Sequence, residues 1–279
     1  MIKVLICGKD SYIGKAFIAK MAGTFKIDEL DLQTEKWRDF DFSKYDVLIH
    51  LAAIVHRTDI KDEELYFRVN SDLPIDVAKT AVNQGLKHFI FFSTMAVYGI
   101  SPSLRGEGRI SIDSRYNPIN LYGISKLKAE SGLIELHNKL DFTLSIIRPP
   151  NVYGENCPGN FYRYMQLCAK YLYVFPLIRH NRFSMISTEE LCYLVEKLIK
   201  DKVDGVICPQ DIGEQSNSKR ISNMAKQYGR FHFQSKLLGK LLYLVFIICP
   251  FRQINNLFGD LFYDETLSKP FPFSKIENR

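Results

Sequence analysis

The chain has 279 residues, 46% of them hydrophobic, and its 37 basic and 31 acidic residues give a formal net charge of +6. This length can bury a sizeable core and fits one large domain or one and a half. The charge is modest and no dense basic run occurs, so nucleic-acid binding is not indicated, although an anionic substrate would be attracted. The six cysteines contain no C-x-x-C pair, which argues against a zinc site or disulfide framework and favours a reducing cytoplasm.

The N-terminal stretch predicts a strand, a glycine turn and a helix. Residues 2–6 form a short apolar run that is too brief for a signal peptide and is typical of a buried parallel strand. Gly8 and Gly14 bracket the following turn, and an amphipathic segment begins at Lys15. Such a turn aims a helix N-terminus at a pyrophosphate, as in a dinucleotide-binding unit. A plain strand-to-helix turn is the alternative interpretation.

From these residues onward the sequence resembles the NAD-dependent epimerase/dehydratase family of extended short-chain dehydrogenases/reductases, which carries G-x-x-G-x-x-G at this point. The chain keeps the outer glycines and has Ser11 at the middle position. The resemblance implies an α/β fold with a doubly wound parallel sheet of the Rossmann type. It also implies a cofactor-binding turn made by Gly8, Ser11, Tyr12, Ile13 and Gly14. The Ser11 side chain would either crowd the pyrophosphate or form a hydrogen bond with it.

The segment after the first helix bears on the choice of cofactor. An acidic residue about 20 residues beyond the glycine turn would bond to the adenosine ribose and favour NAD over NADP. Asp31 is our candidate for this role, and a surface carboxylate is the alternative. Little room remains for a further strand and helix before the apolar run at 46–53. We therefore expect the part of the fold next to the cofactor's adenine to be short, and NADP stays open as an alternative to NAD.

The family places further residues beside the cofactor. By resemblance, Leu51, Ala52 and Ala53 let the dinucleotide lie against the backbone, and Asn70 lies next to it. The sequence predicts a helix over residues 72–84, followed by a buried strand over 88–92.

The candidate catalytic residues follow that strand. Tyr122 and Lys126 share one face of a predicted helix because they are four residues apart, and a nearby ammonium favours tyrosine's phenolate form. Alone, such a pair is more often an ordinary surface pair. The resemblance adds Thr94, whose hydroxyl would bond to a substrate oxygen while Tyr122 moves a proton. Met95 and Ala96 stand where the family's sugar-nucleotide dehydratases carry Asp-Glu, which disfavours dehydration.

The second half of the chain is expected to bind substrate. Residues 148–154, R-P-P-N-V-Y-G, resemble the family's passage from cofactor domain to substrate domain. By that resemblance Asn151 contacts the substrate diphosphate. Arg182 is assigned to the same group, because a planar guanidinium bonds phosphate oxygens bidentately, and a surface ion pair is its alternative role. We expect a Rossmann domain over 1–154 and a small, helix-rich substrate lobe over 155–279, with a frayed polar tail.

The expected activity is NAD-dependent epimerisation at C4 of a nucleotide-linked hexose, which the resemblance connects with surface-polysaccharide synthesis. A reductase of a nucleotide-linked 4-keto sugar would use the same residues, and an NAD(P)-binding regulator without turnover is a third interpretation. No metal site is predicted.

The apolar run at 237–249 is too short to span a membrane. A buried or dimer-facing helix is its simpler interpretation, and a helix lying on a membrane surface is the other. We therefore expect a cytoplasmic protein, and leave a homodimer and peripheral membrane contact open.

Overall fold

The computed structural model describes residues 1–55, 62–104, 108–177, 181–211, 216–231, 233–248 and 252–268. The chain falls into two compact units whose segments alternate along the sequence. Unit 1 comprises residues 1–99, 116–149 and 188–209, and unit 2 comprises residues 100–115, 150–187 and 210–279. Cys249, at the end of the apolar run, and the polar tail from residue 269 lie outside the described residues.

Unit 1 is built on a six-stranded sheet. Its strands are β1 (Lys3–Cys7), β2 (Lys26–Leu30), β3 (Val47–His50), β4 (His88–Phe92), β6 (Thr143–Ile147) and β10 (Gly205–Ile207). They lie in the order β10-β6-β4-β3-β1-β2, and every neighbouring pair is parallel. The order reverses between β1 and β3, which creates a crevice at the carboxyl ends of those strands. The predicted doubly wound parallel sheet is confirmed.

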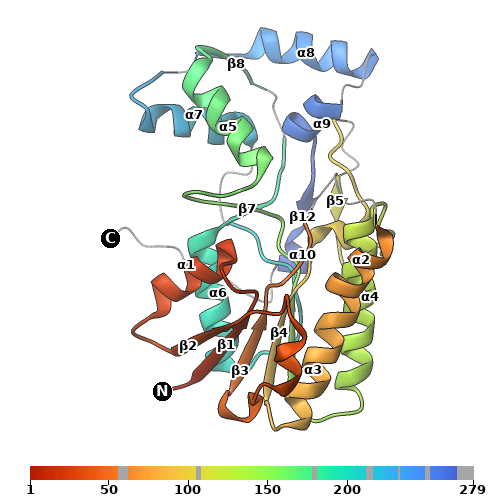
Figure 1. The fold of residues 1–279 in the computed structure, drawn as a ribbon. Coiled ribbons are helices and arrows are strands. Elements are labelled where there is room, and N and C mark those ends of the chain that lie inside the picture. The colour runs from red at the N-terminus through yellow and green to blue at the C-terminus, as the bar shows by residue number, and fades with distance from the viewer. Residues whose placement is uncertain are drawn as a thin grey trace. The chain divides into compact units, whose positions relative to one another are not determined.

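Helices cover both faces of this sheet. They are α1 (Tyr12–Met21), α2 (Glu63–Phe67), α3 (Leu73–Asn83), α4 (Leu121–His137) and α6 (Thr188–Asp201). In Figure 1, α1 and α6 lie against one face and α3 and α4 against the other. The central strands β1, β3, β4 and β6 are almost wholly buried, with every residue of β4 inaccessible or nearly so. Apolar runs of this kind are what a sheet covered on both faces requires.

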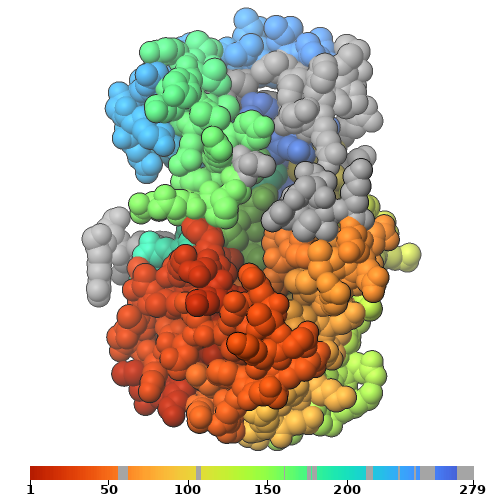
Figure 2. Space-filling view, viewed as in Figure 1, coloured from red at the N-terminus to blue at the C-terminus, as the bar shows by residue number. Residues whose placement is uncertain are grey.

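The segment between β2 and β3 is short, as expected. It contains two 3₁₀ turns, η1 (Glu35–Asp39) and η2 (Phe42–Lys44), where a full helix and strand would need more residues. Trp37 and Phe42 from these turns are buried in the core with the β1 and β3 side chains. Another irregular turn, the π-helical η3 (Arg68–Asp72), joins α2 to α3. Figure 2 shows the face of unit 1 formed by these early residues, in red and orange.

Unit 2 has two-stranded sheets and is rich in helices. Its helices are α5 (Asn160–Tyr171), α7 (Asn217–Gln227), α8 (Lys236–Ile248), α9 (Arg252–Phe258) and α10 (Glu265–Ser268). Its strands are β5 (Arg109–Ile110), β7 (Asn151–Tyr153), β8 (Val174–Pro176), β9 (Met185–Ser187), β11 (Phe233–Ser235) and β12 (Phe262–Tyr263). They form three separate parallel pairs, β5 with β12, β7 with β9 and β8 with β11. The assignment of cofactor binding to 1–154 and substrate binding to 155–279 stays a prediction.

The apolar run expected over 237–249 forms most of α8. Within the described part of the chain, none of the helices combines the length and apolarity that crossing a bilayer requires. Of the two simpler interpretations, a helix buried within the chain is wrong, because Leu237 is 79% exposed and Leu244 is 59% exposed, whereas a dimer-facing helix stays a prediction. Hydrophobic periodicity alone could not show which side of so apolar a helix the rest of unit 2 covers.

Candidate active site

A cavity of about 710 Å³ opens in unit 1 at the carboxyl ends of β1 and β3. Gly8, directly after β1, has a φ of +124°, and a Cβ there would lie 2.7 Å from the backbone N of Ala52. Glycine is therefore required for the two strand ends to approach this closely. The resulting wall is largely backbone, which is the surface that a flat or phosphorylated ligand can lie against. We refer to this space as the β1/β3 cavity.

Ser11, the departure from the family's glycine pattern, caps α1. Its Oγ accepts a hydrogen bond of 3.3 Å from the backbone N–H of Gly14, while its own backbone is extended. The hydroxyl thus satisfies one of the donors that every helix start leaves without an intrahelical partner. A Cβ on Gly14 would lie 2.5 Å from this Oγ, so a larger residue there would disturb the cap. The two positions are mutually adapted.

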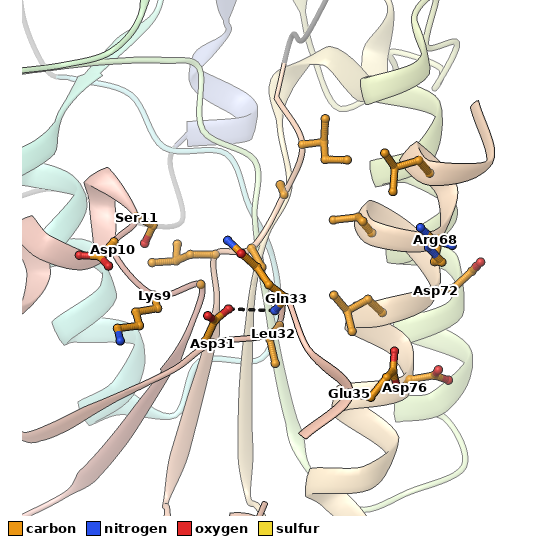
Figure 3. A pocket seen from close by; sticks show the side chains of 18 of the residues that line it. Lys9, Asp10, Ser11, Asp31, Leu32, Gln33, Glu35, Arg68, Asp72 and Asp76 are labelled. Atoms are coloured by element: carbon orange, nitrogen blue, oxygen red, sulfur yellow. Dashed lines mark hydrogen bonds between the residues drawn. The ribbon is translucent and has the colours of Figure 1, made fainter. Parts of the chain in front are cut away.

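Asp31 follows β2 and lines the same cavity. Its Oδ1 accepts a hydrogen bond of 2.8 Å from the backbone N–H of Gln33, which orients the carboxylate. Figure 3 shows Asp31 and Gln33 between the Lys9–Ser11 turn on one side and Arg68 with Asp72 on the other. Asp31, the predicted ribose ligand, is therefore part of the wall of the β1/β3 cavity.

The structure separates the predicted cofactor residues into two groups. Those that line the β1/β3 cavity are Gly8, Ser11, Asp31, Leu51, Ala52 and Ala53. Those outside its lining are Tyr12, Ile13, Gly14 and Asn70, together with Tyr122 and Lys126, which are also predicted to contact the cofactor. The Tyr12 hydroxyl shares a hydrogen bond of 2.8 Å with Thr188 of α6, and the Ile13 side chain lies among core residues under α1.

Asn70 acts from behind the cavity wall. It is fully buried in η3, accepts a hydrogen bond of 2.7 Å from the Ile54 backbone N–H and donates one of 3.0 Å to the Ile54 carbonyl. It also donates to the Ser125 hydroxyl of α4 at 3.2 Å. One side chain thereby ties the segment after β3 to the helix that carries Tyr122 and Lys126.

Sequence reasoning missed most of the cavity's helical wall. Arg68, Asp72 and Asp76 line it from η3 and α3. The prediction for Asn70 could have pointed to Arg68 and Asp72, because all three residues belong to the same irregular turn, η3. Their side-chain directions, however, depend on the π-helical geometry of η3, which no sequence pattern reveals.

Thr94 and Tyr122 meet at the end of β4, the strand beside β3. Thr94 caps the short 3₁₀ turn η4 (Met95–Tyr98), and its Oγ1 accepts from the Ala96 backbone N–H at 3.1 Å. Tyr122 occupies the first turn of α4, and Gly123 beside it lets α4 approach η4. A Cβ on Gly123 would lie 2.8 Å from the Ala96 carbonyl.

Burial dominates the electrostatics of this group. Burial raises the pKa of Tyr122 to about 12, and a hydrogen bond from Thr94 opposes the change only in part. Burial lowers the pKa of Lys126 to about 7. The Lys126 Nζ donates to the Phe92 carbonyl at 2.7 Å and lies 4.5 Å from the centre of the Phe91 ring. Lys126 is therefore directed at β4, and the chain alone keeps Tyr122 a phenol at neutral pH.

A buried ionic network that the sequence did not suggest lies behind these residues. The Arg148 guanidinium donates to Glu130 through Nε at 3.0 Å and through Nη2 at 2.5 Å, and both side chains are about 2% exposed or less. Ser93 also donates to Glu130. The remaining Arg148 nitrogen, Nη1, donates to the hydroxyls of Tyr98 and Tyr116 at 2.9 and 3.0 Å. The bidentate pair satisfies both buried charges.

The predicted diphosphate ligands belong to unit 2 and are described within it. Asn151 is exposed on β7, where its register partner is Met185 of β9. Arg182, three residues before Met185, is also exposed, and its guanidinium carbon lies 3.8 Å from the centre of the Phe262 ring. Its backbone N–H donates to Asp260 at 2.7 Å. Stacking of this kind holds a guanidinium in place.

Comparisons with known proteins agree with the fold. Residues 4–170 match the model of the NAD dependent epimerase/dehydratase family. A UDP-glucose 4-epimerase from Vibrio cholerae is 31% identical over 180 residues, which are 61% of this chain and 52% of that protein. An N-acetyl-alpha-D-glucosaminyl-diphospho-ditrans,octacis-undecaprenol 4-epimerase from Escherichia coli O157:H7 is 27% identical over 274 residues, 85% of this chain and 81% of that protein. The chain thus spans about half of the first of these relatives.

Solved structures share the architecture. A UDP-glucuronic acid 4-epimerase from Bacillus cereus, in complex with NAD, superimposes with a TM-score of 0.66 at 19% identity and covers 84% of this chain and 85% of that one. A dTDP-4-dehydrorhamnose reductase from Clostridium acetobutylicum has a TM-score of 0.66 at 22% identity, with coverages of 84% and 83%. At these identities the likeness extends to the fold alone.

Proposed function

The chain belongs to the NAD-dependent epimerase/dehydratase family, and from that premise we propose that it epimerises C4 of a hexose carried on a diphosphate, with a nucleotide as the carrier. The observation that carries the proposal is the grouping of Thr94, Tyr122 and Lys126 at the end of β4. This strand neighbours β3, whose carboxyl end borders the β1/β3 cavity. Met95 and Ala96 offer no acid or base for dehydration. Surface-polysaccharide synthesis is the proposed setting.

The β1/β3 cavity fits a dinucleotide. Gly8 and the Ser11-capped start of α1 would meet the pyrophosphate, where a helix N-terminus favours negative charge. Leu51, Ala52 and Ala53 would form the wall along which the cofactor lies. When bound, NAD supplies the oxidised nicotinamide that takes a hydride from the sugar carbon and returns it to the opposite face.

The charges of the cavity favour NAD over NADP in this proposal. Asp31 would accept from the ribose hydroxyls and repel a phosphate at the same position. The lining has three basic residues, Lys9, Arg38 and Arg68, and five acidic ones, so its formal charge is negative. Arg38 is held by Glu35 at 2.5 Å and lies 3.7 Å from Asp76, so its charge is already balanced.

The proton chemistry is assigned to Tyr122 and Thr94. Tyr122 would take the proton of the C4 hydroxyl and later give it back, while Thr94 donates a hydrogen bond to the same oxygen. Because burial raises the pKa of Tyr122 to about 12, a base at this position needs positive charge nearby. The positive nicotinamide would supply it together with Lys126, on the same face of α4, in the protonated form that this lysine loses above a pKa of about 7.

A lipid carrier is the second candidate for the substrate. The E. coli relative that aligns with 85% of this chain is named for a sugar joined through a diphosphate to undecaprenol. Both carriers present the same group, a hexosyl diphosphate, and Asn151 and Arg182 are the proposed ligands of that group. A homodimer is a separate proposal that light scattering on the purified chain would test.

Cofactor release separates the alternatives. The purified protein is denatured and its released nicotinamide is measured, and turnover is assayed with UDP-glucose, UDP-N-acetylglucosamine and the undecaprenol-linked sugar in detergent. Stoichiometric NAD with epimerised product supports the proposal. A protein that consumes added NADH or NADPH with a 4-keto sugar nucleotide would be a reductase. NAD binding without conversion of any hexosyl diphosphate would indicate a regulator.

A further inference from the structure

Unit 2 contains long stretches without any acidic residue. Residues 156–188 contain Arg163, Lys170, Arg179 and Arg182 and no Asp or Glu. Residues 215–259 contain Lys219, Arg220, Lys226, Arg230, Lys236, Lys240 and Arg252, again with no Asp or Glu. The rest of the chain therefore holds all 31 acidic residues and 26 of the 37 basic ones, so positive charge is concentrated in these two stretches.

Helix α8, within the second stretch, has two different faces. At 3.6 residues per turn, Leu237, Leu241, Leu244 and Val245 fall on one side, and their exposed fractions are 79, 58, 59 and 43%. We call these four residues the α8 apolar face. Gly239 falls on the opposite side of α8 and packs against Leu177, the residue that follows β8. A Cβ at position 239 would lie only 2.3 Å from the Leu177 carbonyl oxygen.

Basic and aromatic side chains flank this face. Lys236 and Lys240 are exposed on α8 itself, next to the apolar side chains. Phe233, in β11 directly before α8, is 63% exposed, and Tyr173, before β8, is 67% exposed. The Arg230 guanidinium lies 5.2 Å from the centre of the Tyr173 ring. Apolar, aromatic and basic groups in this arrangement are characteristic of helices that lie in the interface of a bilayer.

We propose that the α8 apolar face, with Lys236 and Lys240, docks unit 2 onto the surface of an anionic phospholipid bilayer. Helix α8 is 13 residues long, or about 20 Å at 1.5 Å per residue, so it would lie parallel to the surface. In Figure 2 this helix, in light blue, lies at the surface of the molecule. The inference concerns unit 2 and stands whether or not the proposed reaction is correct.

Charge decides between a bilayer and a second copy of the chain. Two copies joined through this face would bring together two surfaces with basic residues and no acidic partners in the same stretches, which is unfavourable. The cytoplasmic leaflet carries the opposite sign and attracts each nearby lysine or arginine by about 1 kcal/mol. A bilayer therefore matches both the apolar and the charged parts of the surface.

The test is flotation of the full chain with vesicles of phosphatidylcholine alone or of phosphatidylcholine mixed with phosphatidylglycerol. We expect flotation with the anionic vesicles and a marked loss in high salt. Leu241→Glu with Leu244→Glu should abolish it, and Lys236→Gln or Lys240→Gln should each weaken binding roughly fivefold, as about 1 kcal/mol implies. Ile112→Glu, at a residue 70% exposed elsewhere in unit 2, is the matched control and should float like wild type.

Three results would overturn the inference. Absence of flotation with anionic vesicles is the first, and equal flotation of the wild type and the double glutamate variant is the second. The third is a wild-type dimer in light scattering that the same variant converts to a monomer. Turnover of a water-soluble nucleotide sugar by the double variant should match the wild type, so a failure of the proposed reaction would leave the vesicle result unaffected.

Discussion

The two units handle charge in opposite ways. In unit 1 the Arg148–Glu130 pair is buried and hydrogen-bonded, with Arg148 held by Glu130 and by two tyrosine hydroxyls. In unit 2 basic groups such as Lys236 and Lys240 are exposed, next to exposed leucines. A buried, satisfied network fixes geometry, which suits proton transfer, whereas an exposed apolar and basic surface suits contact with something outside the chain. The difference supports the two proposals made above, which place proton transfer in unit 1 and contact with a membrane surface in unit 2.

Removing the Tyr122 hydroxyl should have the largest effect and leave unit 2 untouched. Tyr122→Phe is expected to lower kcat by about 10²–10⁴, which is the usual contribution of a positioned acid or base. Product formation from a hexosyl diphosphate is the measurement, and the amount of bound NAD should stay the same. Tyr164→Phe, at an exposed tyrosine of unit 2, is the control. Similar rates for both variants would contradict the assignment.

Breaking the buried pair tests whether unit 1 depends on it. Glu130→Ala leaves Arg148 buried without its carboxylate, and such losses lower the free energy of unfolding by about 3–5 kcal/mol. Urea unfolding measures the change. The matched control is Glu135→Ala on the same helix, whose exposed pair with Lys139 should contribute under about 0.5 kcal/mol. Equal effects of the two substitutions would mean that burial does not distinguish these pairs.

The pH dependence of stability should report Lys126. Its pKa falls from 10.5 to about 7 on burial, so between pH 7 and 10.5 the unfolded chain binds the extra proton and the folded chain does not. This contribution to stability therefore rises with pH across that window, by up to about 1.4 kcal/mol per pH unit. Lys126→Met should remove the slope. Unfolding free energies measured at pH 7, 8 and 9 test this prediction, and identical slopes in the wild type and Lys126→Met would contradict it.

The smallest expected effect concerns the cofactor. Asp31→Asn should weaken NAD binding by about tenfold, since a hydrogen bond to a charged group contributes roughly 1.5–3 kcal/mol, and should narrow the preference over NADP. Titration calorimetry with both cofactors measures this. Asp39→Asn, a nearby exposed acid outside the cavity lining, should bind NAD as the wild type does. A preference for NAD that survives Asp31→Asn would place discrimination elsewhere.

The parts of unit 1 that sequence could predict are local. Strand β1, its glycine turn and α1 are contiguous, and the turn chemistry of Gly8 is readable from residue type. The short segment between β2 and β3 was likewise predictable, because the number of residues between two strands limits which helices and strands can form there. Helix α4, with Tyr122 and Lys126 on one face, follows from spacing.

What sequence could not predict depends on distant partners. Ser93, Glu130 and Arg148 lie far apart in the chain, and each alone is an ordinary residue until the fold joins them. Lys126 bonds to the Phe92 carbonyl because β4 ends there, which the helical spacing to Tyr122 could not reveal. The exposure of α8 likewise depends on a distant partner, since the position of β8 determines which side of α8 is covered.

The position of β10 has a consequence for how the protein is made. This strand pairs with β6 at the edge of the unit 1 sheet, yet it is encoded after residues 150–187 of unit 2. During synthesis Ser145–Ile147 would present an unpaired strand edge until residue 207 leaves the ribosome. The last strand of this sheet to be translated therefore completes the sheet that began to form first, so chaperone protection would matter most in that interval.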